Sequence, residues 1–385
     1  MFKNFWYACG FSNEFTAQPK RVEMLGQMLA VYRDDRGQPV VLNDLCPHRG
    51  GSLAMGKRDG DCVRCPYHGW KFDSSGTCTE IPANTSKGVP KRARVDAYPT
   101  REAYGLLWAF MGDLPESERP PLPIFPEHGQ PGWRAIHGTW DWNANYERVV
   151  ENAADISHAP FVHAQSFGNP ERPQVEDYAL EETDWSITVH TTLWSPQARV
   201  MQLLGGGRGR YQPVAASPGV QMPCVTTLAL DLPRGMKMRL FDVNVPVDAT
   251  RTRTYWIMLR NFMPWRIFDG SVRNRVHQIF REDCPFVESQ RPELVPSDLS
   301  DELHVKSDRM QLVYRRMRQA LIDRGWGLDA HSMLTLEGKT AVVIPGPARR
   351  EQGAEGTFVF DEVPTLGASP ENEAEPKQDR PTGSD

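Results

Sequence analysis

The chain has 385 residues, enough for two domains, and its 39% apolar and 24% charged residues are typical of an ordinary soluble protein. A net charge of −5 gives no reason to expect a nucleic acid or an anionic membrane as a partner. No apolar run could span a bilayer, and the opening MFKNFWYACG lacks a signal-peptide core, so we expect a cytoplasmic protein.

The first residues predict a small all-β domain. The runs LAVYR and PVVLND flank a turn of sequence Asp-Asp-Arg-Gly at 34–37, which indicates a β-hairpin. Two further β-like runs, KFDSSGTCTEI and YGLLWAFMGD, extend the pattern to about residue 113. We therefore place a first, all-β domain at residues 1–115.

Two motifs, CPHRG and CPYHGW, follow the hairpin within residues 46–70. Their potential ligands are Cys46, His48, Cys65 and His68. Two thiolates and two imidazoles suit a [2Fe-2S] cluster in which the cysteines hold one iron and the histidines hold the other, giving an electron relay of relatively high potential. The alternative is a structural zinc site, for which Cys62 offers a further Cys-x-x-Cys pair. Prolines and glycines around both motifs indicate tight loops rather than a zinc-finger helix, and the whole stretch resembles the Rieske cluster motif.

A Pro- and Gly-rich stretch, ERPPLPIFPEHGQPGW, follows and predicts a linker at residues 116–132. Residues 133–363 then combine β-like and helical runs, which predicts an α+β domain whose antiparallel sheet is covered by helices. The expected strands lie at 133–142, 175–193, 222–231, 236–247 and 251–262, and the expected helices at 143–163, 266–284 and 303–324. The GGGRGR string at 205–210 is expected to be a mobile loop, with a lid over the active site as the alternative, and residues 364–385 a disordered tail.

A second metal site is indicated within residues 152–163. This stretch reads N-x-x-D-x-x-H-x-x-x-x-H and contains Asn152, Asp155, His158 and His163. On an unbroken helix the two histidines would diverge, so we expect Pro160 to break the helix between them and let both rings reach one ion. We also expect Asp155 and His158 to share a helix face. A 2-His-1-carboxylate set on ferrous iron leaves positions open for dioxygen and substrate.

The required carboxylate is predicted to come from the helix near residues 271–287. Val272, Val276, Ile279 and Phe280 form an apolar stripe that Asp283 continues, whereas Glu282 lies off the stripe. Because a carboxylate on a buried face is costly unless it is paired or bound to metal, Asp283 is the expected third ligand.

Taken together, the motifs resemble the Rieske non-heme iron oxygenases, specifically the α-only group that includes vanillate, toluenesulfonate and dicamba monooxygenases. The likeness extends over residues 1–350, from NFWYACG through FREDCPFVESQRP. It implies a Rieske domain joined to a catalytic domain with a curved antiparallel sheet of helix-grip, START-like form. It also implies that Asp155 links a cluster histidine of one subunit to an iron-ligand histidine of the next in a homotrimer. Asn152 matches a family residue near the iron.

The expected activity is that of a terminal oxygenase component. No ferredoxin, flavin or nicotinamide fingerprint is present, so electrons must come from a separate NAD(P)H-dependent reductase, with or without a ferredoxin. The expected reaction is monooxygenation of a small aromatic molecule, by hydroxylation or by O- or N-dealkylation. The alternative within the class is cis-dihydroxylation of an aromatic ring, and the alternative outside it is an electron-transfer or zinc-structured binding protein. Arg199, Arg208 and Arg210 could meet an anionic substrate group.

Overall fold

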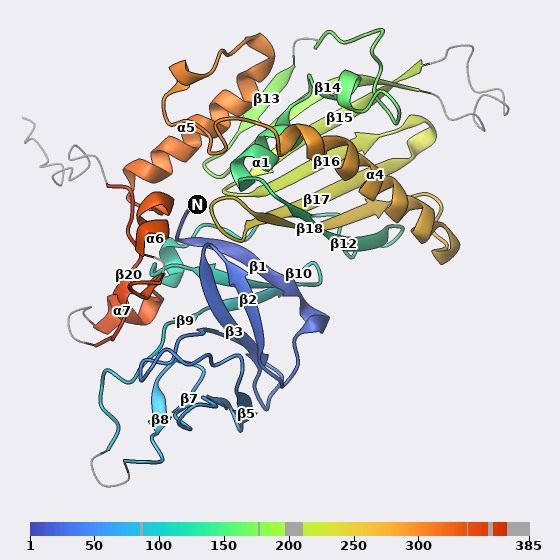
Figure 1. Ribbon diagram of the computed structural model, residues 1–385. Coiled ribbons are helices and arrows are strands. Elements are labelled where there is room, and N and C mark those ends of the chain that lie inside the picture. The colour runs from blue at the N-terminus through green and yellow to red at the C-terminus, as the bar shows by residue number, and fades with distance from the viewer. Residues whose placement is uncertain (85–87, 176–177, 197–210, 337, 353–356, 368–385) are drawn as a thin grey trace, which may run out of the picture.

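The computed structural model describes residues 1–385 except 85–87, 176–177, 197–210, 337, 353–356 and 368–385 (Figure 1). An N-terminal part made of small antiparallel sheets lies beside a larger part in which helices cover a seven-stranded sheet. This arrangement confirms the predicted α+β class. No helix among the described residues is long and apolar enough to cross a membrane.

The N-terminal part contains three small sheets. The first has the order β1-β11-β10, the second β2-β3-β4-β9 and the third β5-β6-β7-β8. Their strands are β1 (Phe5–Phe11), β2 (Lys20–Met24), β3 (Gln27–Arg33), β4 (Pro39–Asn43), β5 (Lys57–Asp59), β6 (Cys62–Arg64), β7 (Lys71–Phe72), β8 (Cys78–Glu80), β9 (Ala97–Tyr98), β10 (Thr100–Ala103) and β11 (Leu106–Met111). β3 and β4 form the predicted hairpin, and the turn between them contains Gly37 at a φ of +77°.

The larger part is built on one antiparallel sheet of order β12-β18-β17-β16-β15-β14-β13. Its strands are β12 (Arg134–Trp142), β13 (Ala179–Glu182), β14 (Ser186–Pro196), β15 (Tyr211–Gln221), β16 (Val225–Asp231), β17 (Lys237–Pro246) and β18 (Thr252–Arg260). The strand expected at 175–193 is in fact two, β13 and the start of β14, paired as a hairpin. β15 was not predicted, and the GGGRGR string before it lies outside the described residues.

Helices cover one face of this sheet (Figure 1). α1 (Tyr146–Ala154), α2 (Ala159–Val162) and α4 (Asp269–Val287) lie on this face, and α5 (Arg309–Asp323) packs against α1 and β14. α6 (Ala330–Leu336) and α7 (Pro347–Gln352) lie instead beside the N-terminal part, near β20. The ion pairs of Asp269 with Arg134 of β12 and Arg260 of β18 fix the start of α4 to the sheet edge. The predicted helices at 266–284 and 303–324 are thereby confirmed as α4 and α5, within a few residues at their ends.

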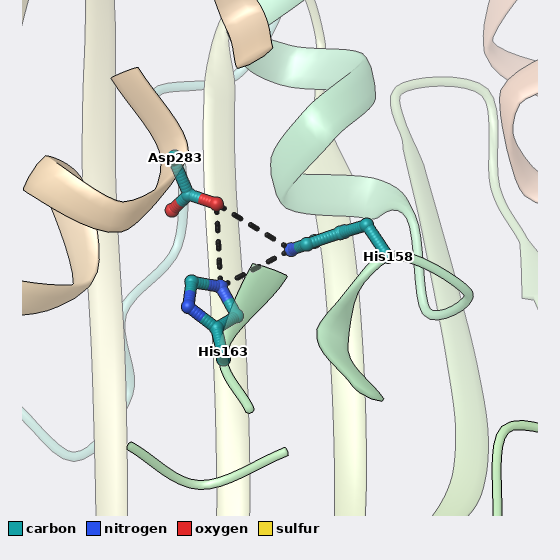
Figure 2. A group of neighbouring side chains, drawn as sticks. All are labelled: His158, His163 and Asp283. Atoms are coloured by element: carbon teal, nitrogen blue, oxygen red, sulfur yellow. Dashed lines mark hydrogen bonds and ion pairs between the residues drawn. The ribbon is translucent and has the colours of Figure 1, made fainter. Parts of the chain in front are cut away.

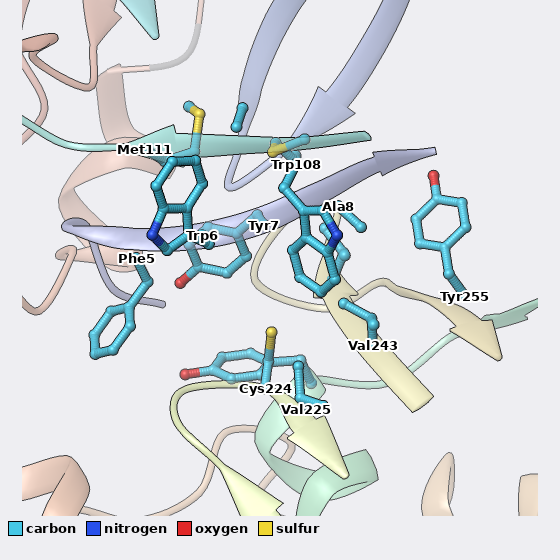
Figure 3. Packing of buried hydrophobic residues seen from close by; sticks show 14 of the residues in the cluster. Phe5, Trp6, Tyr7, Ala8, Trp108, Met111, Cys224, Val225, Val243 and Tyr255 are labelled. Carbon is cyan, nitrogen blue, oxygen red and sulfur yellow. The ribbon is translucent and has the colours of Figure 1, made fainter. Parts of the chain in front are cut away.

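The opposite face of the sheet packs on the first strands of the chain (Figure 3). Phe5, Tyr7 and Trp108 of β1 and β11 belong to one buried cluster with Val225 and Val243 of the large sheet. The Tyr255 hydroxyl also donates to the Cys9 carbonyl at 3.2 Å. Because side chains alternate across a strand, the residues of β16 and β17 between these core positions face the helices instead.

The end of the described chain returns to the N-terminal part. β19 (Val342–Val343) pairs in parallel with β20 (Asp361–Glu362). Between them, Arg349 forms a two-pronged ion pair with Asp96, both distances being 2.8 Å, and the two side chains are almost fully buried. Tyr98 of β9 donates to the Ile344 carbonyl at 2.7 Å. The division into residues 1–115, 116–132, 133–363 and 364–385 stays a prediction, and most of the expected tail lies outside the described residues.

Candidate metal centres

Two matching loops carry the four expected cluster ligands. In the first, the Gly50 amide donates to the Cys46 carbonyl, and in the second the Gly69 amide donates to the Cys65 carbonyl. Gly50 and Gly69 have φ values of +68° and +75°, a conformation that is strained for residues with a side chain. The paired CP…G sequences therefore fold into two equivalent tight turns, as the sequence predicted.

The loops hold the sulfur ligands inside and the imidazoles outside. Cys46 and Cys65 are each 2% exposed, whereas His48 is half-buried and His68 is exposed. The His48 and His68 rings lie 4.3 Å apart between centroids, and His48 stacks on Trp70 at 4.8 Å. The cysteine side of the site is therefore buried, and the histidine side lies at the protein surface.

The donor atoms suit a two-metal cluster better than a single zinc ion. Ligands of one tetrahedral zinc lie within about 4 Å of one another, given metal–ligand distances of about 2.0–2.3 Å. Across the part of the chain that the structure describes, no three of the Cys46, His48, Cys65 and His68 donors come within 4.8 Å of one another. Cys62 is half-buried on β6 and joins no such group among those residues. The buried Nδ1 of His48 has no hydrogen-bond partner within the described chain.

The second site brings together the three residues expected to bind iron (Figure 2). The Nε2 atoms of His158 and His163 are 3.2 Å apart, and Oδ1 of Asp283 is 3.6 Å from the first and 3.2 Å from the second. Ligands about 2.1 Å from one ion and at right angles to each other are about 3 Å apart, so the three atoms fit one ion. Oδ1 of Asp283 is buried without a hydrogen-bond partner among the described residues. Two imidazoles and one carboxylate are the ligand set of non-heme ferrous oxygenases.

The local structure corrects how the two histidines converge. The helix break precedes His158 instead of falling between the histidines at Pro160. Asp155 ends α1 with an extended ψ of 130°, and its side chain accepts from the amides of Ser157 and His158. Pro160 is the second residue of α2, in the first turn, where a missing N–H costs nothing. His158 and His163 flank this four-residue helix, so Asp155 and His158 meet across a turn and share no helix face.

Each histidine has a carboxylate neighbour on its other ring nitrogen. Nδ1 of His158 lies 3.4 Å from Oδ2 of Asp155, and Nδ1 of His163 lies 2.8 Å from Oε2 of Glu282. Burial raises the pKa of Asp155, but the hydrogen bonds from His158 and Ser157 outweigh burial and hold this pKa below its usual value. Such partners fix the tautomer and orientation of a ligating imidazole.

Glu282 was not predicted to take part in the site. The sequence indicated only that it lies off the apolar stripe of α4. Its Oε2 also accepts from Ser166 at 2.7 Å, and its Oε1 accepts from Gln278 at 2.9 Å. The only signal in the sequence was its position beside Asp283, because the contact with His163 depends on how α2 packs on α4.

A cavity of about 130 Å³ adjoins the three residues. One wall is formed by α1, the α2 region and α4, and the other by β14, β15, β16 and β17. Most of the lining is aliphatic or aromatic, including Leu193, Leu228, Leu240, Ile279 and Phe280. An apolar cavity of roughly 150 Å³ holds one benzene ring, so this space suits a compact, mainly apolar molecule.

A separate hollow lies on the outer side of the same helices. Asn152, Asp155 and His158 line both the inner cavity and this hollow, so they form the wall between them. Exposed apolar side chains, Phe286 and Leu303, also line the hollow. Arg148 and Arg315 are held there by Glu302 at 2.9 and 2.6 Å.

Comparison with known families identifies both parts of the chain. Residues 5–99 match the Rieske [2Fe-2S] domain, and residues 142–324 match the vanillate O-demethylase oxygenase C-terminal domain. The chain belongs to the Rieske non-heme iron oxygenases. The oxygenase therefore carries a Rieske [2Fe-2S] cluster and a mononuclear iron, the two cofactors of this class.

Individual relatives agree with this assignment. The oxygenase is 27% identical to the iron–sulfur subunit of the toluene-4-sulfonate monooxygenase system of Comamonas testosteroni, over 74% of this chain and 87% of that relative. It is also 27% identical to methylxanthine N1-demethylase of Pseudomonas putida, over 79% and 82% of the two chains. The solved structure of NdmA from Pseudomonas putida CBB5 superposes with a TM-score of 0.69 at 25% identity, covering 83% and 91%. Proteins of this kind are oxygenase components of systems that include a reductase.

Proposed function

We propose that the chain is a terminal oxygenase component that inserts one oxygen atom of dioxygen into a small aromatic substrate. With two electrons and two protons from the reductase system, R–H and O2 give R–OH and water. Where the hydroxylated carbon bears an ether oxygen or an amine nitrogen, loss of an aldehyde makes the net reaction an O- or N-dealkylation. The single observation that carries this proposal is the convergence of His158, His163 and Asp283 beside an apolar cavity.

The proposed division of labour follows the two sites. When bound, the Rieske cluster supplies single electrons and the ferrous iron activates dioxygen. Cys46, His48, Cys65 and His68 hold the cluster, with the histidine end at the protein surface. His158, His163 and Asp283 would hold the iron beside the cavity that is proposed to receive dioxygen and substrate. Glu282 orients the ring of His163, and the apolar lining excludes water from the reacting carbon.

Asp155 is proposed to join the two sites across a subunit interface. Within the chain, its carboxylate contacts His158 and lies in the wall between the cavity and the outer hollow. The exposed His68 and Tyr67 of a neighbouring subunit would enter that hollow in a homotrimer, with the rim apolar residues covered by the contact. Asn152 would lie in the same wall, near the iron. The donor to the cluster is a separate reductase, used directly or through a ferredoxin.

Asp155→Asn tests this route. The variant should keep both metal centres, because the cluster and iron ligands are unchanged, while turnover with the reductase falls steeply. Metal content, the cluster's electron paramagnetic resonance signal and the rate of product formation are the measurements. As a control, Asp184→Asn changes an exposed carboxylate between β13 and β14 and should leave all three unchanged. Wild-type turnover by Asp155→Asn would contradict the bridge.

The assignment as an oxygenase has its own test. The purified protein should show a Rieske signal and acid-labile sulfide, and contain one more iron than the cluster accounts for. Aryl ethers and N-alkyl aromatic amines would be screened with a surrogate reductase, with release of formaldehyde as the sign of dealkylation. A dihydrodiol product would instead establish the cis-dihydroxylation alternative. A colourless protein that contains zinc and lacks labile sulfide would refute the oxygenase assignment.

A further inference from the structure

One acidic side chain stands out in the wall of the cavity. Asp242 lies in the middle of β17, between Thr226 of β16 and Trp256 of β18 in the strand register. Phe241 and Val243, on either side of it, point into the core on the opposite face. The alternation of the strand therefore places the Asp242 carboxyl on the cavity face of the sheet.

The polar residues next to Asp242 bond to one another. The Asn244 side-chain amide donates to the Thr226 hydroxyl at 3.1 Å, and the Thr254 hydroxyl donates to the Asn244 carbonyl oxygen at 2.7 Å. The Trp142 indole in turn donates to Thr254 at 2.9 Å. These groups are satisfied within the wall and have a structural role.

The Asn244 amide also donates to the Asp242 backbone carbonyl at 3.3 Å, but the Asp242 carboxyl takes no part in this network. Its Oδ1 is buried and has no hydrogen-bond partner among the described residues. Burial raises the pKa of Asp242 to about 7, because no neighbouring cation stabilises the charged form. A carboxyl in an apolar wall costs free energy unless something pairs with it. No side chain among the described residues is placed to pair with this oxygen.

The charge of the cavity limits what that partner can be. Of the described residues that line it, none is a lysine or an arginine. A carboxylate or sulfonate group placed beside Asp242 would meet a like charge, and no lysine or arginine among the described lining residues would compensate it. A group that donates a hydrogen bond, above all a cationic nitrogen, would gain from the same surroundings, because charge-assisted hydrogen bonds are strongest where water is excluded. The arginines 199, 208 and 210 lie outside the described residues.

We propose that Asp242 is a substrate-recognition residue and that the substrate is a compact amine that carries one aromatic ring and a basic nitrogen, which donates a hydrogen bond to this carboxyl. This inference rests on the proposed function, since it assumes that the cavity receives the substrate. The amine is held at the sheet wall, while the three iron ligands come from the helix wall. A carbon attached to that nitrogen or to the ring then faces the iron.

The test uses three probes that share one ring and differ in charge. Toluene, benzylamine and benzoate would be titrated into the anaerobic, fully metallated protein by calorimetry. A charge-assisted hydrogen bond is worth about 1.5–3 kcal/mol, so benzylamine should bind about tenfold or more tightly than toluene. Benzoate should bind most weakly. Asp242→Asn, which keeps the shape but loses the charge, should remove the preference for benzylamine and leave toluene binding unchanged.

Two further variants guard this result. Asp242→Leu should bind toluene at least as well as the wild type, and it serves as the second test if Asp242→Asn folds poorly. Asp184→Asn is the matched surface control and should bind all three probes like the wild type.

The inference is overturned if benzoate binds as tightly as benzylamine, if the wild type shows no preference, or if Asp242→Asn keeps the preference. Metal analysis separates this failure from failure of the proposed function. A protein with both iron centres and no amine preference contradicts only the role of Asp242, whereas a protein without a Rieske signal contradicts the oxygenase assignment itself.

Discussion

Replacement of Glu282 by glutamine is the sharpest test of how the iron ligands are held. The Glu282 carboxylate accepts three hydrogen bonds, from His163, Ser166 and Gln278, at 2.8, 2.7 and 2.9 Å. A glutamine has one acceptor oxygen and one donor NH2 in the same volume, so at least one of these three donors loses its acceptor. The His163 ring, which is only 2% exposed, also loses the negative charge of Glu282. This charge favours the tautomer whose Nδ1–H points at the carboxylate.

The expected effect is on retention of the mononuclear iron. Loss of such a partner of a metal-bound histidine typically lowers metal affinity about 10- to 100-fold. This corresponds to about 1.4–2.7 kcal/mol, which agrees with the value of a hydrogen bond to a charged group. Solvent does little to reduce the effect, because the Glu282 side chain is 16% exposed.

The assay is competition for iron. The variant and the wild type would be dialysed anaerobically against graded chelator, and the remaining iron counted relative to the cluster's own visible absorption. The cluster signal should stay constant, since Glu282 is remote in sequence and structure from both cluster loops. Glu293→Gln, an exposed carboxylate beyond the end of α4, is the matched control. Equal iron retention by Glu282→Gln and the wild type would refute the positioning role.

Two further predictions concern stability around the sites. Gly168→Ala should lower both iron content and melting temperature, because the added Cβ would lie 2.2 Å from the Ala159 carbonyl oxygen. Gly270→Ala is the control, since its Cβ would have no atom within 4 Å. A normal iron content in Gly168→Ala would contradict the predicted clash. Arg349→Met should destabilise the protein by about 3–5 kcal/mol in denaturant unfolding, because it leaves the carboxylate of Asp96 buried and unpaired. A loss below about 0.5 kcal/mol would show that this ion pair is no more important than one on the surface.

The metal ligands stay a prediction, but every candidate was marked by a short local pattern in the sequence. Cys46 to His48 and Cys65 to His68 need only a tight turn, and the glycines that allow the turns are adjacent. Asp283 could be proposed because a carboxylate occupies the next position of an apolar helix stripe. In each case the candidate ligand could be recognised from residues within about one helical turn or one loop.

The features that the sequence analysis missed all depend on contacts between segments that are distant in the chain. β15 contains Pro213 and Pro218, which normally argue against a central strand, yet it lies between β14 and β16 because its small residues pair with both. The helix break before His158 occurs because the Asp155 side chain accepts from the Ser157 amide at the end of α1. From the sequence, this break was expected at Pro160 instead. Glu282 contacts His163 only because α2 packs near α4, and Asp242 lines the cavity only because the helices cover the sheet.

Strand β17 contributes one face to the core and the other face to the cavity, and this separation has an evolutionary consequence. Phe241, Val243 and Val245 face the core, while Leu240, Asp242 and Asn244 face the cavity. Asn244 is held by its hydrogen bonds to Thr226 and Thr254, but substitutions at Leu240 and Asp242 can accumulate under selection for a new substrate while the residues that maintain the fold stay unchanged. A library that randomises only Leu228, Leu240 and Asp242 should be rich in folded, metal-loaded variants with altered substrate preference.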